Sequence, residues 1–213
     1  MRSFLALLAV ALCAVVLGQG RAADDDKDFV DVFNGKDFKG LKFEIGKSDP
    51  EKTWSVKDGV IICTGKPNGY FYTDKSYKNF VMRYDWRYKR PDNLKEDKDF
   101  GGNSGALMHI QEPHKVWPKC VEVQGENRTH GSFIFISCKG TGKYDKAAKD
   151  KAVKPVGEWN TTEITCLPDG AMTVKINGAD VNAGMSELTE GPFGFQSEGA
   201  EIHFKNIKVK QLK

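Results

Sequence analysis

The feature that most constrains the fold of this chain is a series of short β-prone runs separated by glycine-containing turns. Asp58-Gly59, Asp169-Gly170 and Asn177-Gly178 have the residue types that favour tight hairpin turns. Only 144–152, rich in lysine and alanine, favours a helix. Many short strands joined by such turns indicate an all-β sandwich or barrel. The expected strands are 30–33, 54–56, 60–64, 80–88, 105–110, 121–124, 133–137, 161–167, 173–176, 193–197 and 202–212.

Strand parity predicts which side chains share a face, because successive side chains of a strand point to opposite sides. If the apolar set of each strand fills the space between two sheets, the polar set points away from the core. The residues expected to point away in this manner are Arg83, Asp85, Arg87, His109, Glu122 and Gln124. A face with basic, acidic and amide groups is more typical of a binding or catalytic site than of solvated sheet surface. The ordinary solvated face remains the simpler alternative.

The N-terminal segment has the layout of a secretory signal peptide. Arg2 precedes an apolar run over 4–17, and a small-x-small cleavage site follows at 20–22. The run is shorter than the roughly 20 residues that a membrane span needs. We therefore expect a signal peptide at 1–22, an exposed linker at 23–28 and one domain at 29–213. The protein would be secreted or periplasmic, with no membrane span.

The charge of the chain argues against nucleic acid as a partner. The formal net charge is +3, and removal of 1–22 takes away Arg2 and Arg21 and no acid, which leaves +1. Phosphate binding needs a clustered basic surface, and a nearly neutral chain of this kind lacks that signal.

Four cysteines remain after the signal peptide, an even number that suggests two disulfides in an exported protein. Cys120 and Cys138 lie almost symmetrically about the turn near Arg128, which predicts a bridge across a hairpin. Cys63–Cys166 would then follow by elimination. A zinc site is the alternative, although no pair has the CxxC spacing.

The sequence requires no cofactor. The charged loop 89–103 could hold a divalent metal such as calcium through Asp97 and Asp99, although carboxylates in a charged loop are more often only solvated.

Eight phrases of the chain occur in one order that resembles the 3-keto-disaccharide hydrolase domain family, long described as a domain of unknown function. The resemblance extends from about residue 29 to residue 212, and it implies a concanavalin-like jelly roll of two curved antiparallel sheets with a carbohydrate site on the concave face. The phrases are FNGKD (33–37), WSVKDG (54–59), DWR (85–87), NSG (103–105), EVQ (122–124), GEWN (157–160), GPFGFQ (191–196) and FKNI (204–207).

Two positions depart from the family pattern. Many members have an arginine where this chain has His109, and Asp-His-Gly where it has Ser197-Glu198-Gly199. If that histidine is catalytic in the relatives, Glu198 either substitutes for it or this protein does something else.

The resemblance implies cleavage of 3-keto-glycosides. The carbonyl at C3 acidifies the proton at C2, so a base can remove this proton and expel the C1 substituent, after which water adds to the enone. This chemistry needs a base, a donor at the C3 oxygen and an acid for the leaving group. The catalytic candidates are Glu122, His109 and Glu198. The candidates for contacts to the sugar are Arg83, Asp85, Arg87, Asn103, Gln124, Trp117, Lys139, Tyr144 and Gln196.

Two other functions remain open. A retaining glycosidase would use Glu122 and Glu126, but Gln124 replaces the middle acid of the corresponding row. Residues i and i+4 of a strand also lie about 13 Å apart, whereas retaining chemistry needs carboxyl groups about 5 Å apart. A non-catalytic carbohydrate-binding module on the same fold would use Trp117 or Tyr144 to stack on sugar rings.

Overall fold

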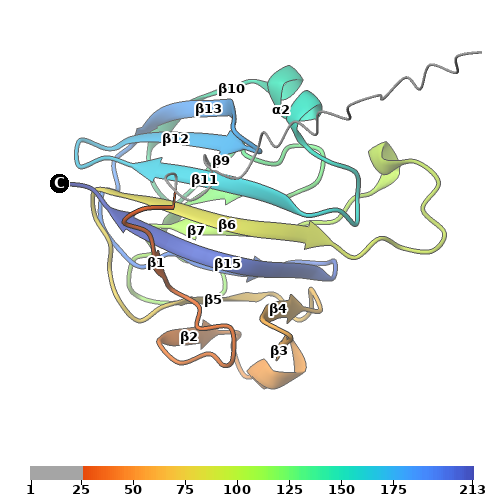
Figure 1. Cartoon of the computed structure of the whole chain (residues 1–213). Coiled ribbons are helices and arrows are strands. Elements are labelled where there is room, and N and C mark those ends of the chain that lie inside the picture. The colour runs from red at the N-terminus through yellow and green to blue at the C-terminus, as the bar shows by residue number, and fades with distance from the viewer. Residues whose placement is uncertain (1–25) are drawn as a thin grey trace, which may run out of the picture.

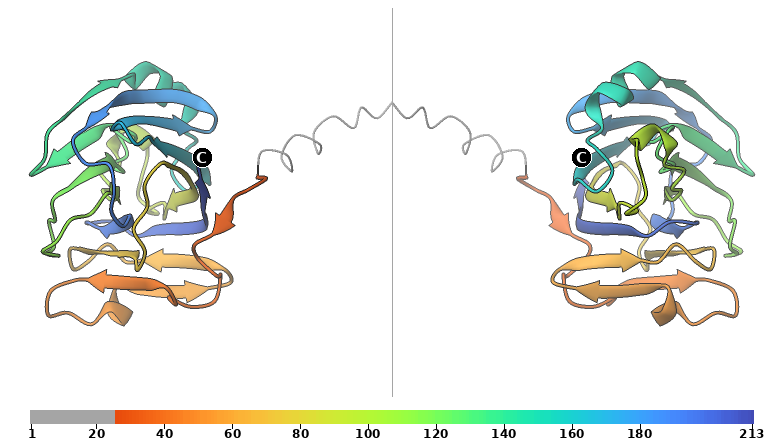
Figure 2. Two further views of the ribbon diagram at one scale, coloured as in Figure 1. Left: turned by 90° about the vertical axis from the view of Figure 1, so that its left-hand side faces the viewer. Right: turned by 90° about the vertical axis from the view of Figure 1, so that its right-hand side faces the viewer.

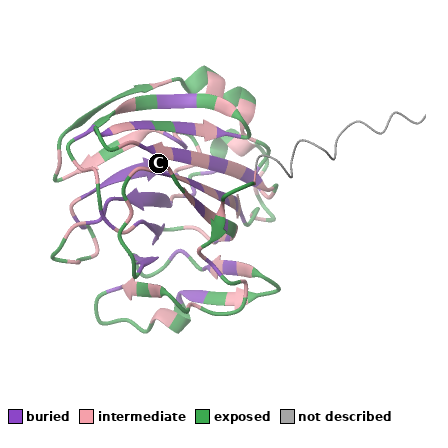
Figure 3. Ribbon diagram, turned by 60° about the vertical axis from the view of Figure 1, so that its left-hand side comes forward, coloured by how far each residue is buried: buried purple, intermediate pink, exposed green. Residues whose placement is uncertain are grey.

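Strand β6 (Phe80–Tyr88) shows how the sequence builds this fold. Its residues alternate between buried and half-buried along the whole strand, so the apolar set of Phe80, Met82, Tyr84, Trp86 and Tyr88 faces the interior. The same period of two recurs in the neighbouring strands (Figure 3). Each strand therefore contributes one apolar face to a common core.

The computed structural model describes residues 26–213, whose strands form two antiparallel sheets packed face to face (Figures 1 and 2). The expected all-β, concanavalin-like sandwich is confirmed. The larger sheet has the order β10-β13-β12-β11-β6-β15-β4-β3, and β1 also pairs with β15. Its strands are β1 (Val30–Asp31), β3 (Trp54–Lys57), β4 (Val60–Cys63), β6, β10 (Gly140–Tyr144), β11 (Asn160–Cys166), β12 (Ala171–Ile176), β13 (Ala179–Ser186) and β15 (Ile202–Gln211).

The smaller, six-stranded sheet has the order β2-β5-β14-β7-β8-β9 and lies behind β6, β11 and β15 in Figure 1. Its strands are β2 (Leu41–Glu44), β5 (Gly69–Thr73), β7 (Gly105–Met108), β8 (Cys120–Gln124), β9 (Phe133–Ile136) and β14 (Gly194–Ser197). The short helices are η1 (Pro50–Lys52), η2 (Asp97–Asp99) and α2 (Lys146–Ala152), and α2 lies within the expected helical stretch.

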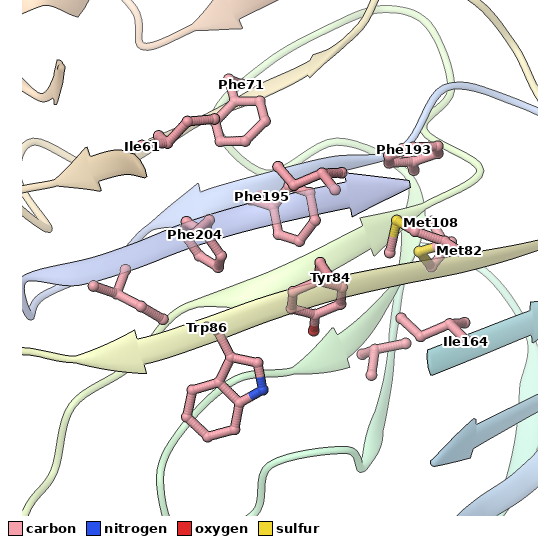
Figure 4. Close-up of a cluster of buried hydrophobic side chains, with 14 of the residues drawn as sticks. Ile61, Phe71, Met82, Tyr84, Trp86, Met108, Ile164, Phe193, Phe195 and Phe204 are labelled. Atoms are coloured by element: carbon pink, nitrogen blue, oxygen red, sulfur yellow. The ribbon is translucent and has the colours of Figure 1, made fainter. Parts of the chain in front are cut away.

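Aromatic side chains from both sheets interlock in the core (Figure 4). Phe195 of β14 packs on Tyr84 of β6 and Phe204 of β15, with ring centroids 4.8 and 4.9 Å apart. Phe71 of β5 packs on Phe195 at 5.3 Å. These contacts fix the two sheets relative to each other, so the strands that carry the polar outer faces are held on a rigid frame.

Four strands were not predicted from the sequence: β2, β5, β10 and β13. Strand β13 has the weak strand sequence ADVNAGMS. Its Gly184 lies so close to β10 that an added Cβ would come within 1.9 Å of the Thr141 carbonyl oxygen. Close backbone approach selected glycine there, and glycine removes the strand signal from the sequence.

The predicted disulfides are wrong. The four cysteines of the described residues are free thiols. Cys166 pairs with Phe80, whereas Cys63 pairs with Ile202, which in turn pairs with Tyr88. Cys63 and Cys166 therefore lie near opposite ends of β6, on the order of 25 Å apart along the strand direction, and a disulfide needs Cα atoms within about 7 Å.

Cys120 and Cys138 do lie close together, as the turn between them suggested. The Cys138 thiol donates a hydrogen bond to the Cys120 carbonyl oxygen at 3.2 Å instead of forming a bridge.

The predicted signal peptide at 1–22 lies outside the described residues. Of the predicted exposed linker, the described part is anchored at two residues. The Asp26 carboxylate accepts hydrogen bonds from Arg83 at 2.8 Å and from Lys208 at 2.7 Å. Asp28 pairs with Lys210 at 3.4 Å. Within 26–213, no helix is long and apolar enough to cross a membrane.

Candidate functional site

Polar side chains gather on the outer face of the six-stranded sheet, where its four central strands run side by side. Strand register places Gln196 opposite Tyr70, Gly105 opposite Gln124, and Leu107 opposite Glu122. Their strand neighbours Phe71, Ala106, Val123 and Phe195 belong to the core between the sheets. Because alternate residues point to opposite faces, Tyr70, Gln196, Glu122 and Gln124 point outward together.

Gly105 forms the floor of this face. An ideal Cβ at this position would lie 2.5 Å from both Gln196 Oε1 and Glu122 Oε1. The backbone of β7 is therefore bare where the carboxyl and amide groups of two neighbouring strands approach each other. A side chain larger than hydrogen would displace these groups.

Glu122 and Gln196 are buried, and three of their polar atoms lack a hydrogen-bond partner among residues 26–213. Glu122 is 3% exposed and Gln196 is 1% exposed. Within the described residues, Glu122 Oε1 and both polar atoms of the Gln196 amide lack a hydrogen-bond partner. Buried polar atoms are normally paired, so unpaired ones in an ordered sheet indicate a place where a ligand or water supplies the bonds.

The carboxyl groups of this face have raised pKa values. Burial raises the pKa of Glu122 to about 8, and the charge of Glu198 acts in the same direction. Burial also raises the pKa of the half-buried Glu198, which follows β14. Two interacting carboxyl groups in unlike environments titrate apart, which is the arrangement that separates a general acid from a general base.

The segment that joins β7 to β8 folds over one side of the face. Tyr70 Oη lies 3.4 Å from His114 Nδ1, and the His114 ring packs on Tyr72 with centroids 4.5 Å apart. Trp117 of the same segment is 41% exposed. Sequence reasoning did not place Tyr72 and His114 at the site, because β5 was not recognised as a strand and a loop histidine carries no positional signal.

Arg83, Asp85 and Arg87 do not join this site. They point outward from β6, which belongs to the nine-stranded sheet, so they lie on the opposite side of the sandwich. The prediction treated the polar sets of all strands as one face, but each sheet of a sandwich has its own outer face. Arg83 is bound to Glu163 and Asp85 accepts a hydrogen bond from Thr161, at 2.7 and 2.6 Å respectively.

His109 is also separated from Glu122. Its backbone has a positive φ of 55°, which ends the regular alternation of β7. The ring lies at the core residue Phe80 with centroids 6.0 Å apart, and it is 1% exposed. Burial lowers the pKa of His109 to about 4, so the imidazole is neutral at pH 7. The prediction that His109 faces Glu122 is wrong for this geometric reason.

The other predicted contact residues are dispersed. Asn103 is half-buried just before β7, and its side chain accepts a hydrogen bond from the Ser104 amide. Lys139 is exposed after β9. Tyr144 lies on β10 of the larger sheet and donates a hydrogen bond to the His130 carbonyl. The Gln124 side chain accepts a hydrogen bond from the Glu126 amide at 2.7 Å. Of the predicted site residues, the structure thus brings Glu122, Gln124, Gln196 and Glu198 together.

The predicted calcium position does not fit a metal. Asp97 accepts hydrogen bonds from Arg90 on one carboxylate oxygen and from the Val156 amide on the other. Among residues 26–213, no group of three or more His, Cys, Asp and Glu side chains is arranged to hold a metal ion.

Proteins of known structure share this architecture. A protein of Parabacteroides distasonis, provisionally assigned as a glycosyl hydrolase, is 27% identical, with a TM-score of 0.65 over 90% of this chain and 97% of its own. The carbohydrate-binding module CBM66 of Bacillus subtilis is 11% identical, with a TM-score of 0.55 over 81% of this chain and 96% of the module. The second similarity concerns the fold alone.

Sequence comparison gives the family. The 3-keto-disaccharide hydrolase of Bacteroides thetaiotaomicron is 23% identical over 88% of this chain and 80% of its own length. The model of the 3-keto-alpha-glucoside-1,2-lyase-like domain matches residues 28–210. That match spans both sheets and the outward face around Gly105, and the chain belongs to the 3-keto-alpha-glucoside-1,2-lyase-like domain family.

Proposed function

We propose that this protein cleaves 3-keto-glycosides by elimination followed by hydration, with Glu122, Gln196 and Glu198 as the reacting groups. The observation that carries the proposal is the buried pair of Glu122 and Gln196 beside the bare backbone of Gly105. Three polar atoms of this pair lack a hydrogen-bond partner in the described part of the chain. The chain belongs to a family of carbohydrate-active proteins, and its site needs a ligand that can form hydrogen bonds. Both observations support a sugar as the substrate.

The first step is removal of the proton at C2. Glu198 is the proposed base, since it is half-buried whereas Glu122 is only 3% exposed. The electron pair of the C2–H bond moves into the ring toward the C3 carbonyl, which becomes an enolate. The buried Gln196 amide is the proposed donor to the C3 oxygen, where the negative charge develops.

The second step is loss of the C1 substituent. The enolate re-forms the carbonyl, a double bond forms between C1 and C2, and the C1–O bond breaks. Glu122 is proposed to donate its proton to the departing oxygen, because a carboxyl with a pKa of about 8 is protonated at pH 7. Addition of water across the double bond then returns a 3-keto sugar, so the net reaction is hydrolysis.

The family member from Bacteroides thetaiotaomicron is described as a 3-keto-disaccharide hydrolase, which supports the same substrate class for this chain. The change from Asp-His-Gly to Ser197-Glu198-Gly199 does not remove the base: Glu198 offers a carboxylate in place of an imidazole, near Glu122.

The deciding experiment is mass spectrometry of a 3-keto disaccharide incubated with the mature protein, beside the unoxidised parent sugar, with and without a chelator. We expect release of a 3-keto monosaccharide and its enone intermediate from the oxidised substrate only. Cleavage of neither sugar would contradict the proposal and favour a non-catalytic carbohydrate-binding module. Cleavage of the unoxidised parent would instead favour an ordinary glycosidase.

We also propose that the protein is exported. The layout of residues 1–22 supports this, and the mature N-terminus of protein recovered from the extracellular or periplasmic fraction would test it. An intact N-terminus on protein found only in the cytoplasm would contradict export.

A further inference from the structure

A cavity with a volume of about 490 Å³ lies between η2, the turn after β8, and the helix α2 with the segment that follows it. It shares no lining residue with the outer face around Gly105. The cations that line it are Lys98, Arg128, Lys146, Lys149 and Lys154, against two carboxylates, Asp97 and Asp150. The lining therefore has a formal net charge of +3.

The two carboxylates are already occupied by other groups. Asp97 is bound to Arg90, which is not part of the lining, and to the Val156 amide. Asp150 accepts from both Lys146 and Lys149, at 2.6 and 3.1 Å. Two ammonium groups thus share one carboxylate. Lys98 and Arg128 pair with Glu96 at 2.6 Å and Glu126 at 3.9 Å, outside the lining. The surplus positive charge therefore belongs to the Lys146–Lys149 pair and to Lys154.

The surplus positive charge costs free energy because the ammonium group of Lys149 is buried. Its side chain is 7% exposed, while its partner Asp150 is 46% exposed. A buried ammonium needs a full counter-charge, since burial removes its hydration. Lys154, also in the lining, is exposed and forms no ion pair with any residue of 26–213.

We propose that this cavity binds an acidic sugar unit, through a sulfate, phosphate or carboxylate group held by Lys149, Lys154 and Arg128. The oxyanion would supply the counter-charge that the cavity lacks and accept charge-assisted hydrogen bonds from these groups. The volume lies within the range of small-molecule sites and leaves room for a sugar ring besides the anion. This site shares no residue with the proposed catalytic face, so an experiment can contradict one of the two proposals without affecting the other.

The test is a titration of the mature protein, followed by ¹H–¹⁵N NMR of the Asn127 and Val156 amides at constant ionic strength. The probes are glucuronate, glucose 6-sulfate, inorganic sulfate, inorganic phosphate and neutral glucose. We expect saturable shifts with the acidic sugars, weaker binding of the inorganic ions by about tenfold, and none with glucose.

Matched variants locate the site. Lys149→Gln and Lys154→Gln should each raise the dissociation constant for glucuronate or glucose 6-sulfate about tenfold. Lys151→Gln is the control, because Lys151 is exposed on the same helix and does not line the cavity. If Lys149→Gln fails to fold, the exposed Arg128→Gln replaces it.

Two results would overturn the proposal. If Lys151→Gln and Lys154→Gln weakened binding of the acidic sugars equally, the binding would come from the overall positive charge of the helix and not from this cavity. Inorganic sulfate binding as tightly as the acidic sugars would exclude a sugar-specific site.

Discussion

The two outer faces of the sandwich have the same alternating sequence pattern but opposite chemistry. On the nine-stranded sheet, Arg83 is bound to both Glu163 and Asp26, and Asp85 accepts from Asn206 at 2.7 Å. On the six-stranded sheet, Glu122 and Gln196 are more deeply buried and have unpaired polar atoms. The polar side chains on the outer face of the nine-stranded sheet pair with one another. The buried polar atoms on the outer face of the six-stranded sheet need hydrogen bonds from a ligand or water.

The pKa values of the carboxyl groups also differ between the two outer faces. A side-chain hydrogen bond from Lys208 lowers the pKa of Asp26 on the larger sheet. Burial raises the pKa of Glu122 on the smaller one. A polar row on a strand therefore indicates function only when its members lack partners, which explains why Arg83 and Asp85 were plausible candidates in the sequence and are structural in the protein.

The largest effect is expected from Glu122→Gln, which removes the proposed proton donor while keeping its shape. Turnover of a 3-keto disaccharide should fall about 10³-fold, while binding of the substrate largely survives. The matched variant on the other face, Glu163→Gln, should leave turnover within about twofold and cost at most about 1 kcal/mol of stability. Steady-state kinetics and thermal melts compare the turnover and the stability of the two variants. Equal losses of turnover would show that the two faces do not differ in function.

The same substitution should stabilise the fold at alkaline pH. Glu122 has a folded pKa of about 8 against an ordinary value of 4.5. Between these values the unfolded chain loses a proton that the folded chain keeps, so stability falls as pH rises through this window. Glu122→Gln removes this loss. The difference of 3.5 pKa units (8 − 4.5) sets the limit, so at pH 8 we expect a gain of at most about 5 kcal/mol in the free energy of unfolding. A destabilised variant at pH 8 would show that Glu122 has structural partners.

The next effect tests the floor of the site. Gly105→Ala places a methyl group within 2.5 Å of Gln196 Oε1 and Glu122 Oε1. We expect turnover to fall about 10²-fold because both groups must move. Gly101→Ala is the control, since the nearest atom to its Cβ would be Arg128 Nη2 at 4.0 Å. Unchanged kinetics for Gly105→Ala would place the reaction elsewhere.

The smallest effect is the pH dependence of kcat/KM. If Glu122 donates a proton, activity should decline about tenfold for each pH unit above its pKa of about 8. Glu122→Gln should abolish this decline in whatever activity it retains. If activity instead rose through pH 8, Glu122 would be the base and Glu198 the proton donor.

Much of this protein could be predicted from its sequence where local physics decides. The alternation of residues 80–88 identified β6, and the Asp58-Gly59 and Asp169-Gly170 turns identified two hairpins, because strand period and turn conformation depend on neighbouring residues. Glu122 and Gln124 were assigned to an outward face for the same reason. Strand β13, selected for close packing rather than strand propensity, escaped prediction.

The sequence by itself therefore determined the all-β class, the family resemblance and the face of each strand on which a side chain lies. Only the tertiary structure decided which sheet each strand joins, since sheet order depends on contacts between residues far apart in the chain. That assignment moved Arg83, Asp85 and Arg87 to the far side and brought Gln196 beside Glu122. Strand register within the nine-stranded sheet separated Cys63 from Cys166, which the number of cysteines in the sequence could not reveal.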